Sequence, residues 1–175
     1  MSALAWAGTD RIDKAWAVLG TVLDPEVPAL SVRDLGIVRD VIGSAESAEL
    51  EIVLTPTYSG CPATEVIEQS VLEAIAQAGL GPARVRLQRA PAWTTDWISE
   101  EGKRKLREYG IAPPSPSGPG DAVPLRFMGR RDSSPACPRC SSTDTERLSA
   151  FGSTACKALY RCRACREPFE YFKPI

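Results

Sequence analysis

Histidine is absent from the 175 residues of this chain, and aromatic residues make up only 7% of them. Without an imidazole, the chain lacks the side chain that most often acts as a base, proton shuttle or metal ligand near neutral pH. Ser-His-Asp and Cys-His nucleophiles and histidine-containing zinc sites are therefore excluded. Any bound metal must be held by cysteine, by carboxylate or by a substrate.

Long apolar runs are also missing, since no stretch reaches the roughly 18 residues that a membrane span needs. The first 23 residues contain four charged side chains, Asp10, Arg11, Asp13 and Lys14. This pattern is untypical of a targeting segment. We therefore expect a cytoplasmic protein without a membrane partner.

The charge pattern does not favour a nucleic-acid partner. The formal net charge is -1, with 10 Lys+Arg against 5 Asp+Glu from Leu125 onward and 11 against 17 before it. Four thiolates around one Zn²⁺ would reduce the excess of the tail to about +3. An excess of this size, without an aromatic or basic stripe, makes nucleic acid an unfavoured partner.

Hydrophobic periodicity predicts an α+β protein whose first domain is a small helix–hairpin–helix–strand unit. The expected elements are helices over 10–23, 62–78 and 95–109, an antiparallel hairpin of 36–42 with 49–55, and a strand over 83–89 after a right-handed crossover. Val66 belongs to the expected apolar stripe of the second helix. Gly102 should weaken the third helix.

A proline-rich stretch divides the chain. Five prolines and two glycines lie between Ala112 and Pro124, a composition that neither a helix nor a central strand accepts. With 43% hydrophobic residues, the chain can bury one core of roughly 100 residues and still carry a smaller unit. We predict a first domain over 1–111, a linker over 112–124 and a second domain over 125–175.

Five of the six cysteines lie in the last 39 residues. Cys137 and Cys140, and again Cys162 and Cys165, form two C-x-x-C knuckles separated by 21 residues. This spacing lets four thiolates converge tetrahedrally and predicts a C-terminal Cys₄ zinc ribbon. In so small a module the metal would supply much of the folding free energy. Four cysteines alone do not separate structural zinc from a redox or iron-sulfur role.

Two further features of the ribbon bear on its geometry. Glycine often follows the second cysteine of a knuckle, but Ser141 and Arg166 stand there, and a left-handed backbone at either would cost about 1 kcal/mol. Cys156 lies outside both knuckles. It can be a small buried side chain, a functional thiol or alternative ligand, or a member of a rearranged zinc site.

Cys61 directly precedes the predicted helix over 62–78 and would be its N-cap. At such a position, unpaired amides and the helix dipole favour the thiolate. The preceding loop, which begins with Thr55, supplies hydroxyl groups. Because no histidine can act as a base, a lone thiolate suits ligation better than turnover. A passive cap is the alternative.

Three segments in succession resemble the signatures of the SufT-like iron-sulfur assembly domain. They are Asp24-Pro-Glu26-Val-Pro28, Asp34-Leu-Gly36-Ile-Val38 and Leu54-Thr55-Pro-Thr-Tyr-Ser-Gly-Cys61-Pro62. Because of the appended ribbon and the segments 91–97 and 151–157, the chain is similar to the non-catalytic accessory proteins of phenylacetyl-CoA epoxidase systems.

The resemblance implies that the protein matures the multisubunit epoxidase of aerobic phenylacetate breakdown, by supplying or inserting its di-iron or iron-sulfur centre. It implies that Cys61 binds iron or an iron-sulfur cluster transiently and passes it on, with Asp24, Glu26 and Thr55 as the other residues of the transfer site. The epoxidase oxygenase and reductase subunits would be the partners, and a homodimer is left open.

Other interpretations of these residues remain. Asp24 and Glu26 can form an acidic turn with solvated side chains. Trp93 and Trp97 can pack in the core or anchor a partner. The whole protein can instead be a structural subunit of the oxygenase complex, or a zinc-ribbon adaptor.

Overall fold

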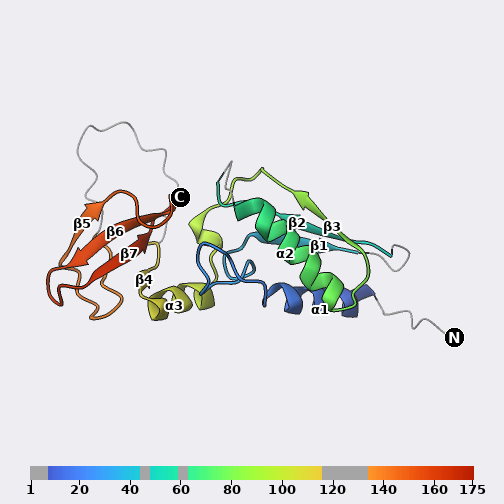
Figure 1. Cartoon of the computed structure of the whole chain (residues 1–175), viewed down its shortest axis with the longest axis horizontal. Helices are drawn as coiled ribbons and strands as arrows, with labels where there is room; N and C mark the ends of the chain where they lie inside the picture. The colour runs from blue at the N-terminus through green and yellow to red at the C-terminus, as the bar shows by residue number, and fades with distance from the viewer. Residues whose placement is uncertain (1–7, 44–47, 59–62, 116–133) are drawn as a thin grey trace. The chain divides into compact units, whose positions relative to one another are not determined.

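The computed structural model describes residues 8–43, 48–58, 63–115 and 134–175 (Figure 1). The chain divides into two compact units, Met1–Gly102 and Lys103–Ile175. The first holds α1 (Gly8–Leu19), β1 (Val38–Ile42), β2 (Leu50–Leu54), α2 (Ala63–Gln77), β3 (Ala83–Leu87) and the 3₁₀-helix η1 (Thr95–Trp97). The second holds β4 (Ile111–Ala112), β5 (Thr145–Ser149), β6 (Lys157–Cys162) and β7 (Pro168–Phe172), and α3 (Glu100–Tyr109) crosses the division.

The first unit is a three-stranded sheet with the order β1-β2-β3. β1 and β2 pair antiparallel, and β2 and β3 pair parallel with Leu54 beside Leu87. A parallel pair needs a crossover, and α2 provides it. α1 and α2 contact each other and the sheet, and α2 lies across the strands in Figure 1. The predicted α+β fold with its hairpin is confirmed.

The core of this unit contains the alternating apolar residues of β2 and the apolar stripe of α2. Leu50, Ile52 and Leu54 of β2 are at most 1% exposed. α2 buries Ala63, Ile67, Val71 and Ile75, which follow one another at i, i+4 along one helix face. Val66 was expected in this stripe but is 52% exposed, because it lies one residue before the buried row.

Gly79 ends α2 as the sequence predicts. Its φ is +66°, a left-handed conformation that glycine adopts without a steric penalty. The Leu80 amide donates to the Ile75 carbonyl at 3.3 Å, and the Gly79 amide donates to the Ala76 carbonyl at 3.0 Å. This Schellman pattern satisfies carbonyls that the helix end would leave without donors. The chain is thereby redirected into β3.

The turn before β1 is held by the segment around η1. The Trp93 ring nitrogen donates to the Leu35 carbonyl at 2.9 Å, and Trp93 is 3% exposed. Gly36 has φ +69°, and a Cβ there would lie 2.5 Å from the Trp97 carbonyl oxygen. The Arg39 guanidinium lies 3.5 Å from the centre of the Trp97 ring. Trp93 therefore packs in the core, which is the first of its two interpretations.

Two helices differ from their predicted bounds. The first ends at Leu19 instead of residue 23, and Leu23 is 55% exposed. The third does not run continuously over 95–109, because Ile98 has an extended backbone between η1 and α3. Ser99 then accepts the Gly102 amide at 2.9 Å and caps α3. The Ser99 hydroxyl thus accepts a first-turn amide that has no partner within the helix, and a new helix can begin here.

The second unit is a four-stranded sheet with the order β4-β7-β6-β5. Tyr160 packs at its centre, stacked on Phe169 and edge-on to Tyr171. β4 pairs parallel with β7, so residues 111 and 112 belong to the sheet of the second unit. We expected them to end the first domain and to begin the linker. Residues 116–124 of the predicted linker lie outside the described residues.

No helix in the described ranges is long and apolar enough to cross a lipid bilayer.

Candidate metal centre and predicted cluster site

Each C-x-x-C knuckle is a tight turn closed by a hydrogen bond that a backbone amide donates. In the first, the Ser141 amide donates to the Cys137 carbonyl at 2.8 Å. In the second, the Cys165 amide points to the Cys162 sulfur at 3.5 Å. The residues after the knuckles, Ser141 and Arg166, have φ of 61° and 65°. Both therefore adopt the left-handed backbone and carry its steric cost, although neither is glycine.

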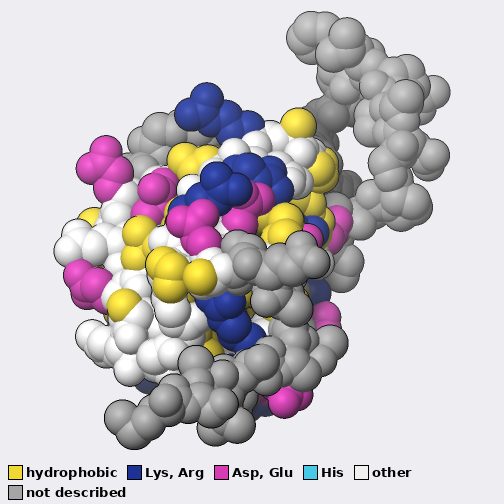
Figure 2. Space-filling model, turned by 90° about the vertical axis from the view of Figure 1, so that its right-hand side faces the viewer, with side chains coloured by type: hydrophobic (Ala, Val, Ile, Leu, Met, Phe, Trp, Pro, Cys, Tyr) yellow, Lys and Arg dark blue, Asp and Glu magenta, His cyan; other side chains and the backbone are white. Residues whose placement is uncertain are grey.

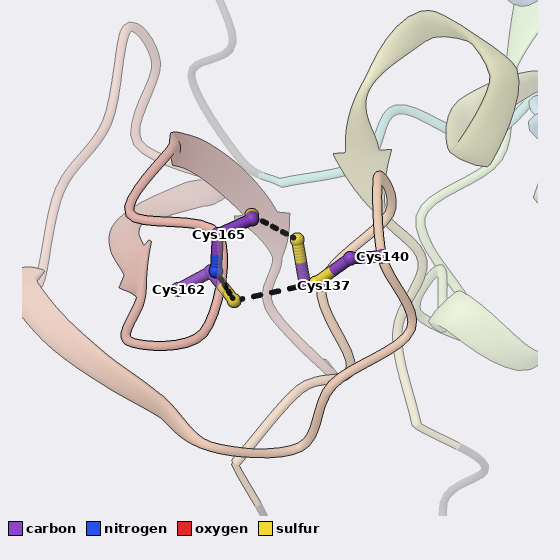
Figure 3. Close-up of side chains that lie close together, drawn as sticks. All are labelled: Cys137, Cys140, Cys162 and Cys165. Atoms are coloured by element: carbon purple, nitrogen blue, oxygen red, sulfur yellow. Dashed lines mark hydrogen bonds between the residues drawn. The ribbon is translucent and has the colours of Figure 1, made fainter.

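The two knuckles bring four sulfurs together (Figure 3). The Sγ atoms of Cys137, Cys140, Cys162 and Cys165 all lie within 4.8 Å of one another. Cys137 and Cys165 are 3.7 Å apart, and Cys140 and Cys162 are 3.5 Å apart. Tetrahedral zinc with Zn–S bonds of about 2.3 Å would separate its sulfurs by about 3.8 Å. The four cysteines therefore form a metal-binding site whose dimensions fit zinc.

Two thiols of this cluster have pKa values shifted in opposite directions. The Cys165 amide lowers the pKa of Cys162 to about 7. The Glu167 amide acts in the same direction on Cys165, but burial and the three neighbouring thiols outweigh it and raise the pKa of Cys165 to about 12. A bound divalent cation would favour the thiolate form of both cysteines, because thiolates are the metal ligands.

Cys156 lies outside the four-sulfur cluster. It is 6% exposed, and its Sγ is 3.0 Å from the Thr154 hydroxyl. Its carbonyl accepts the Lys173 amide at 2.9 Å. These contacts favour the first of the three alternatives for Cys156, a small buried side chain in the ribbon.

The predicted cluster site in the first unit is only partly within the described residues. Cys61 lies outside them, so its place as a helix cap stays a prediction. Thr55 follows directly on β2 and is 1% exposed. Its amide donates to the Ile37 carbonyl at 2.8 Å. Among the described residues, its hydroxyl oxygen has no hydrogen-bond partner.

Asp24 is not a solvated side chain. It is 6% exposed, and its Oδ1 accepts the amides of Glu26 at 2.9 Å and Val27 at 2.7 Å. The carboxylate therefore orders the turn in which it lies, as aspartate commonly does. Glu26 is half-buried beside it. Asp24 does form a turn, as one of the two interpretations expected. Its side chain, however, is buried and not solvated.

Backbone hydrogen bonds connect this turn with Thr55. The Val32 amide donates to the Val22 carbonyl at 2.9 Å, and the Ile37 amide donates to the Val32 carbonyl at 3.0 Å. Ile37 in turn accepts the Thr55 amide. Thr55 therefore lies at the end of the sheet where β2 and β3 have their carboxyl ends, and backbone bonds through Ile37 and Val32 link it to Val22, two residues before Asp24. Open α/β sheets commonly bind ligands at this edge.

Asp34, which opens the second of the three signature segments, forms a buried pair with Ser31 that the sequence analysis did not predict. Asp34 is 8% exposed, and its Oδ2 accepts both the amide and the hydroxyl of Ser31. Ser31 accepts the Asp34 amide in return at 3.0 Å. The reciprocal spacing of serine and aspartate three residues apart was the available signal.

The matches to known protein families follow the two units. Residues 12–86 match the family model described as "Iron-sulfur cluster assembly protein", and residues 122–173 match that of the "PaaD zinc beta ribbon domain". A solved DUF59 domain from Bacillus anthracis is 27% identical, with a TM-score of 0.53 over 57% of this chain and 93% of its own. This likeness agrees with the assembly-domain match.

Two sequence relatives cover different parts of the chain. A "Fe-S protein maturation auxiliary factor" from Porphyromonas gingivalis is 32% identical over 90 residues, 51% of this chain and 84% of its own. A protein of Escherichia coli that is named as a subunit of 1,2-phenylacetyl-CoA epoxidase is 46% identical over 175 residues, 100% of both chains. With an assembly domain, a PaaD-type ribbon and an end-to-end match of this identity, the chain belongs to the PaaD family.

Proposed function

We propose that this protein is a non-catalytic maturation factor that carries iron or an iron-sulfur cluster at Cys61 and delivers it to phenylacetyl-CoA epoxidase. The observation that carries the proposal is the buried Thr55 hydroxyl, which has no partner among the described residues. It lies at the carboxyl end of β2, six residues before Cys61. A buried donor without a partner costs stability, and a bound cargo would offset this cost.

The relatives support both halves of the proposal. The Porphyromonas gingivalis relative is named for iron-sulfur protein maturation, and its match spans about half of this chain. The Escherichia coli relative is named for phenylacetyl-CoA epoxidase and matches from end to end. Combining the two names gives a maturation role directed at this epoxidase.

The chemistry that we propose is ligand exchange without oxidation or reduction. The Cys61 thiolate is a soft ligand that suits iron or a cluster. The Thr55 hydroxyl would donate a hydrogen bond to a bound sulfur or oxygen, and the Glu26 carboxylate would face the cargo from the neighbouring turn. Asp24 would keep that turn in shape through the two amides it accepts. The cargo then leaves when cysteine or carboxylate ligands of the recipient replace Cys61.

The ribbon has a different role in this proposal. Its four cysteines would hold zinc permanently, because the two knuckles enclose the ion with four thiolates and leave no open position. Zinc would supply folding free energy and no transfer chemistry. The oxygenase and reductase subunits of the epoxidase are the proposed partners.

The proposal is tested with Cys61→Ser. Serine caps helices well, so the free energy of unfolding should change by less than about 1 kcal/mol. The variant should nevertheless fail to restore epoxidase activity in cells that lack the native protein, because a hydroxyl is a poor ligand for soft metals. Anaerobically purified wild-type protein should contain iron in addition to zinc, and its visible spectrum should show charge-transfer bands. A folded Cys61→Ser protein that restores full activity would leave Cys61 as a passive cap.

A structural role in the oxygenase is a second candidate, because the Escherichia coli relative is named as a subunit. A pull-down from cells with active epoxidase separates the two. A subunit would be present in stoichiometric amounts, whereas a maturation factor would be absent from the active complex or far below stoichiometry.

A zinc-ribbon adaptor for nucleic acid has less support. Basic and acidic side chains lie side by side on the described part of the face in Figure 2. In the ribbon itself, Glu146 pairs with both Arg161 and Arg163. Paired arginines contribute little net attraction for phosphate, and a strongly salt-dependent affinity for DNA or RNA would be required to revive this candidate.

A further inference from the structure

The loop between β5 and β6, residues 150–156, presents a large aromatic side chain to solvent. Phe151 is 65% exposed, the highest fraction among the large apolar side chains of the described residues. Neither the metal centre nor the predicted cluster site uses this residue. We call residues 150–156 the Phe151 loop.

The loop is held in one conformation by hydrogen bonds to the sheet. The Gly152 amide donates to the Lys157 carbonyl at 2.7 Å, and the Ser153 amide donates to Glu170 Oε1 at 2.5 Å. At the other end of the loop, the Lys173 amide donates to the Cys156 carbonyl at 2.9 Å. Backbone groups that follow Phe151 in the loop are therefore tied to β6, β7 and the residue after β7.

An ion pair between a buried lysine and a half-buried glutamate supports these bonds. Lys157 is 3% exposed, and its Nζ lies 3.0 Å from Glu170 Oε2. Glu170 thus binds the lysine with one oxygen and the Ser153 amide with the other. A Cβ on Gly152 would lie 2.6 Å from the same carboxylate, so glycine allows the close approach. Buried charges of this kind are stable only when their partners are well placed, and here they hold the loop.

A lysine lies beside the exposed ring. Lys157 and Glu170 compensate each other, whereas Lys173 contacts no carboxylate among the described residues. Its Nζ lies 4.5 Å from the centre of the Phe151 ring and donates to the Ala150 carbonyl at 3.2 Å. An aromatic ring on an ordered loop loses little conformational entropy when it is buried in an interface. A cation beside the ring favours a partner surface with carboxylates.

We propose that Phe151 and Lys173 form a docking anchor for a protein that offers an apolar socket bordered by carboxylates. This inference rests on the proposed function, and the partner is therefore the oxygenase component of phenylacetyl-CoA epoxidase. Phe151 enters the socket, and Lys173 pairs with a carboxylate at its rim. The anchor is separate from the cargo site, so docking and transfer use different residues.

The test measures binding of the full-length protein to the purified oxygenase component at low and moderate salt. Phe151→Ala should raise the Kd by roughly tenfold or more, as truncation of an aromatic anchor does. Lys173→Gln should raise the Kd less and reduce its salt dependence. Tyr109→Ala is the matched control, because Tyr109 is 59% exposed and the register of β4 places it toward the Pro168 end of β7, away from the loop. Its Kd should equal that of the wild type.

Zinc content and thermal unfolding of each variant report whether it is folded. If Phe151→Ala loses zinc, the Kd and salt dependence of Lys173→Gln decide the test. A wild-type protein that binds and matures the oxygenase, with an unchanged Kd in both variants, would overturn the anchor and leave the proposed function in place. A wild type that neither binds nor matures the oxygenase would overturn both. A dimer of this chain that Phe151→Ala dissociates, with oxygenase binding unchanged, would assign the anchor to a second copy and also overturn the proposal.

Discussion

Thr55 combines burial with a hydroxyl that has no hydrogen-bond partner among the described residues. Its exposed fraction is 1%, and its amide is engaged with Ile37 while its Oγ1 has no partner in the described ranges. Valine has nearly the same shape as threonine and lacks the polar atom. A buried hydroxyl without a partner lowers stability relative to valine, and a bound ligand would offset this loss.

We expect Thr55→Val to keep or raise the free energy of unfolding, by up to about 2 kcal/mol, because it removes a buried group without a partner. The same variant should lose most of its ability to mature the epoxidase, whereas Thr55→Ser should retain it. Urea unfolding and complementation of cells lacking the native protein measure the two effects. A Thr55→Val protein that is both stable and fully active would remove Thr55 from the proposed site.

Gly36 and Gly79 share a left-handed backbone but differ in their neighbours. Gly36→Ala places a Cβ 2.5 Å from the Trp97 carbonyl, whereas Gly79→Ala meets nothing within 4 Å. Gly79→Ala should cost about 1 kcal/mol for its backbone alone. Gly36→Ala should cost about 2 kcal/mol more, because η1 must move away from the turn before β1. Equal costs for the two variants in denaturant unfolding would show that the close approach is not a constraint.

At the scale of elements, the ribbon sheet depends on ion pairs of two kinds. Glu146 on β5 binds Arg161 and Arg163, whose side chains are 53% and 57% exposed. Glu170 on β7 binds Lys157, whose side chain is only 4% exposed. Solvent screens the first kind, so the second should contribute more to stability.

Burial alone would raise the pKa of Glu170, but the Ser153 amide and the Lys157 ammonium outweigh it and hold the pKa below its usual range. A depressed carboxyl pKa contributes stability that is fully present above the unfolded pKa of about 4.3 and lost as the pH falls through the folded value. Glu170→Gln should therefore lower the stability of the second unit by about 2 kcal/mol at pH 7, and this deficit should shrink as the solution is acidified below pH 4.

Thermal unfolding from pH 7 to pH 3, with zinc release recorded in parallel, measures this difference. Glu146→Gln is the matched control, and its effect should be smaller at every pH because its partners are exposed. A deficit for Glu170→Gln that stays constant across this range would mean that the charge of Glu170 does not stabilise the sheet.

At the scale of the whole molecule, the two units have separate sources of stability. The first has an apolar core in which Leu19, Leu30, Leu50, Ile52 and Ile75 are 0% exposed. The core cluster of the second is small and includes two of the metal-binding cysteines, Cys137 and Cys162. Loss of the metal should therefore act on the two units unequally.

We expect chelation to unfold the segment 103–175, including β4, while the first unit keeps its core. Circular dichroism and limited proteolysis after chelator treatment would follow the two units separately. Substituting any of the four clustered cysteines singly should release zinc, whereas Cys156→Ser should retain it. Equal loss of structure in both units, or zinc release from Cys156→Ser, would contradict this division.

Much of this organisation could be predicted from local patterns. The hairpin, α2 with its Gly79 end, and β3 follow from apolar periods and turn residues, because such signals act within a few residues. The zinc ribbon follows from cysteine spacing, which restricts how two turns can meet. The break at Ile98 could not be predicted, because it depends on Ser99 capping α3 and on the fit of η1 to Gly36.

The sequence by itself determined the ligand set of the metal site, the absence of imidazole chemistry and the order of the two units. Only the tertiary structure decided the burial of Asp24 and of Thr55, whose hydroxyl has no partner within the described ranges, and the pairing of β4 with β7. It also fixed Phe151 in an exposed position on an ordered loop. The physical reason is the distance along the chain over which each property is set. Spacing and composition are properties of neighbouring residues, whereas burial and hydrogen-bond satisfaction depend on residues that are far apart in sequence and that folding brings together.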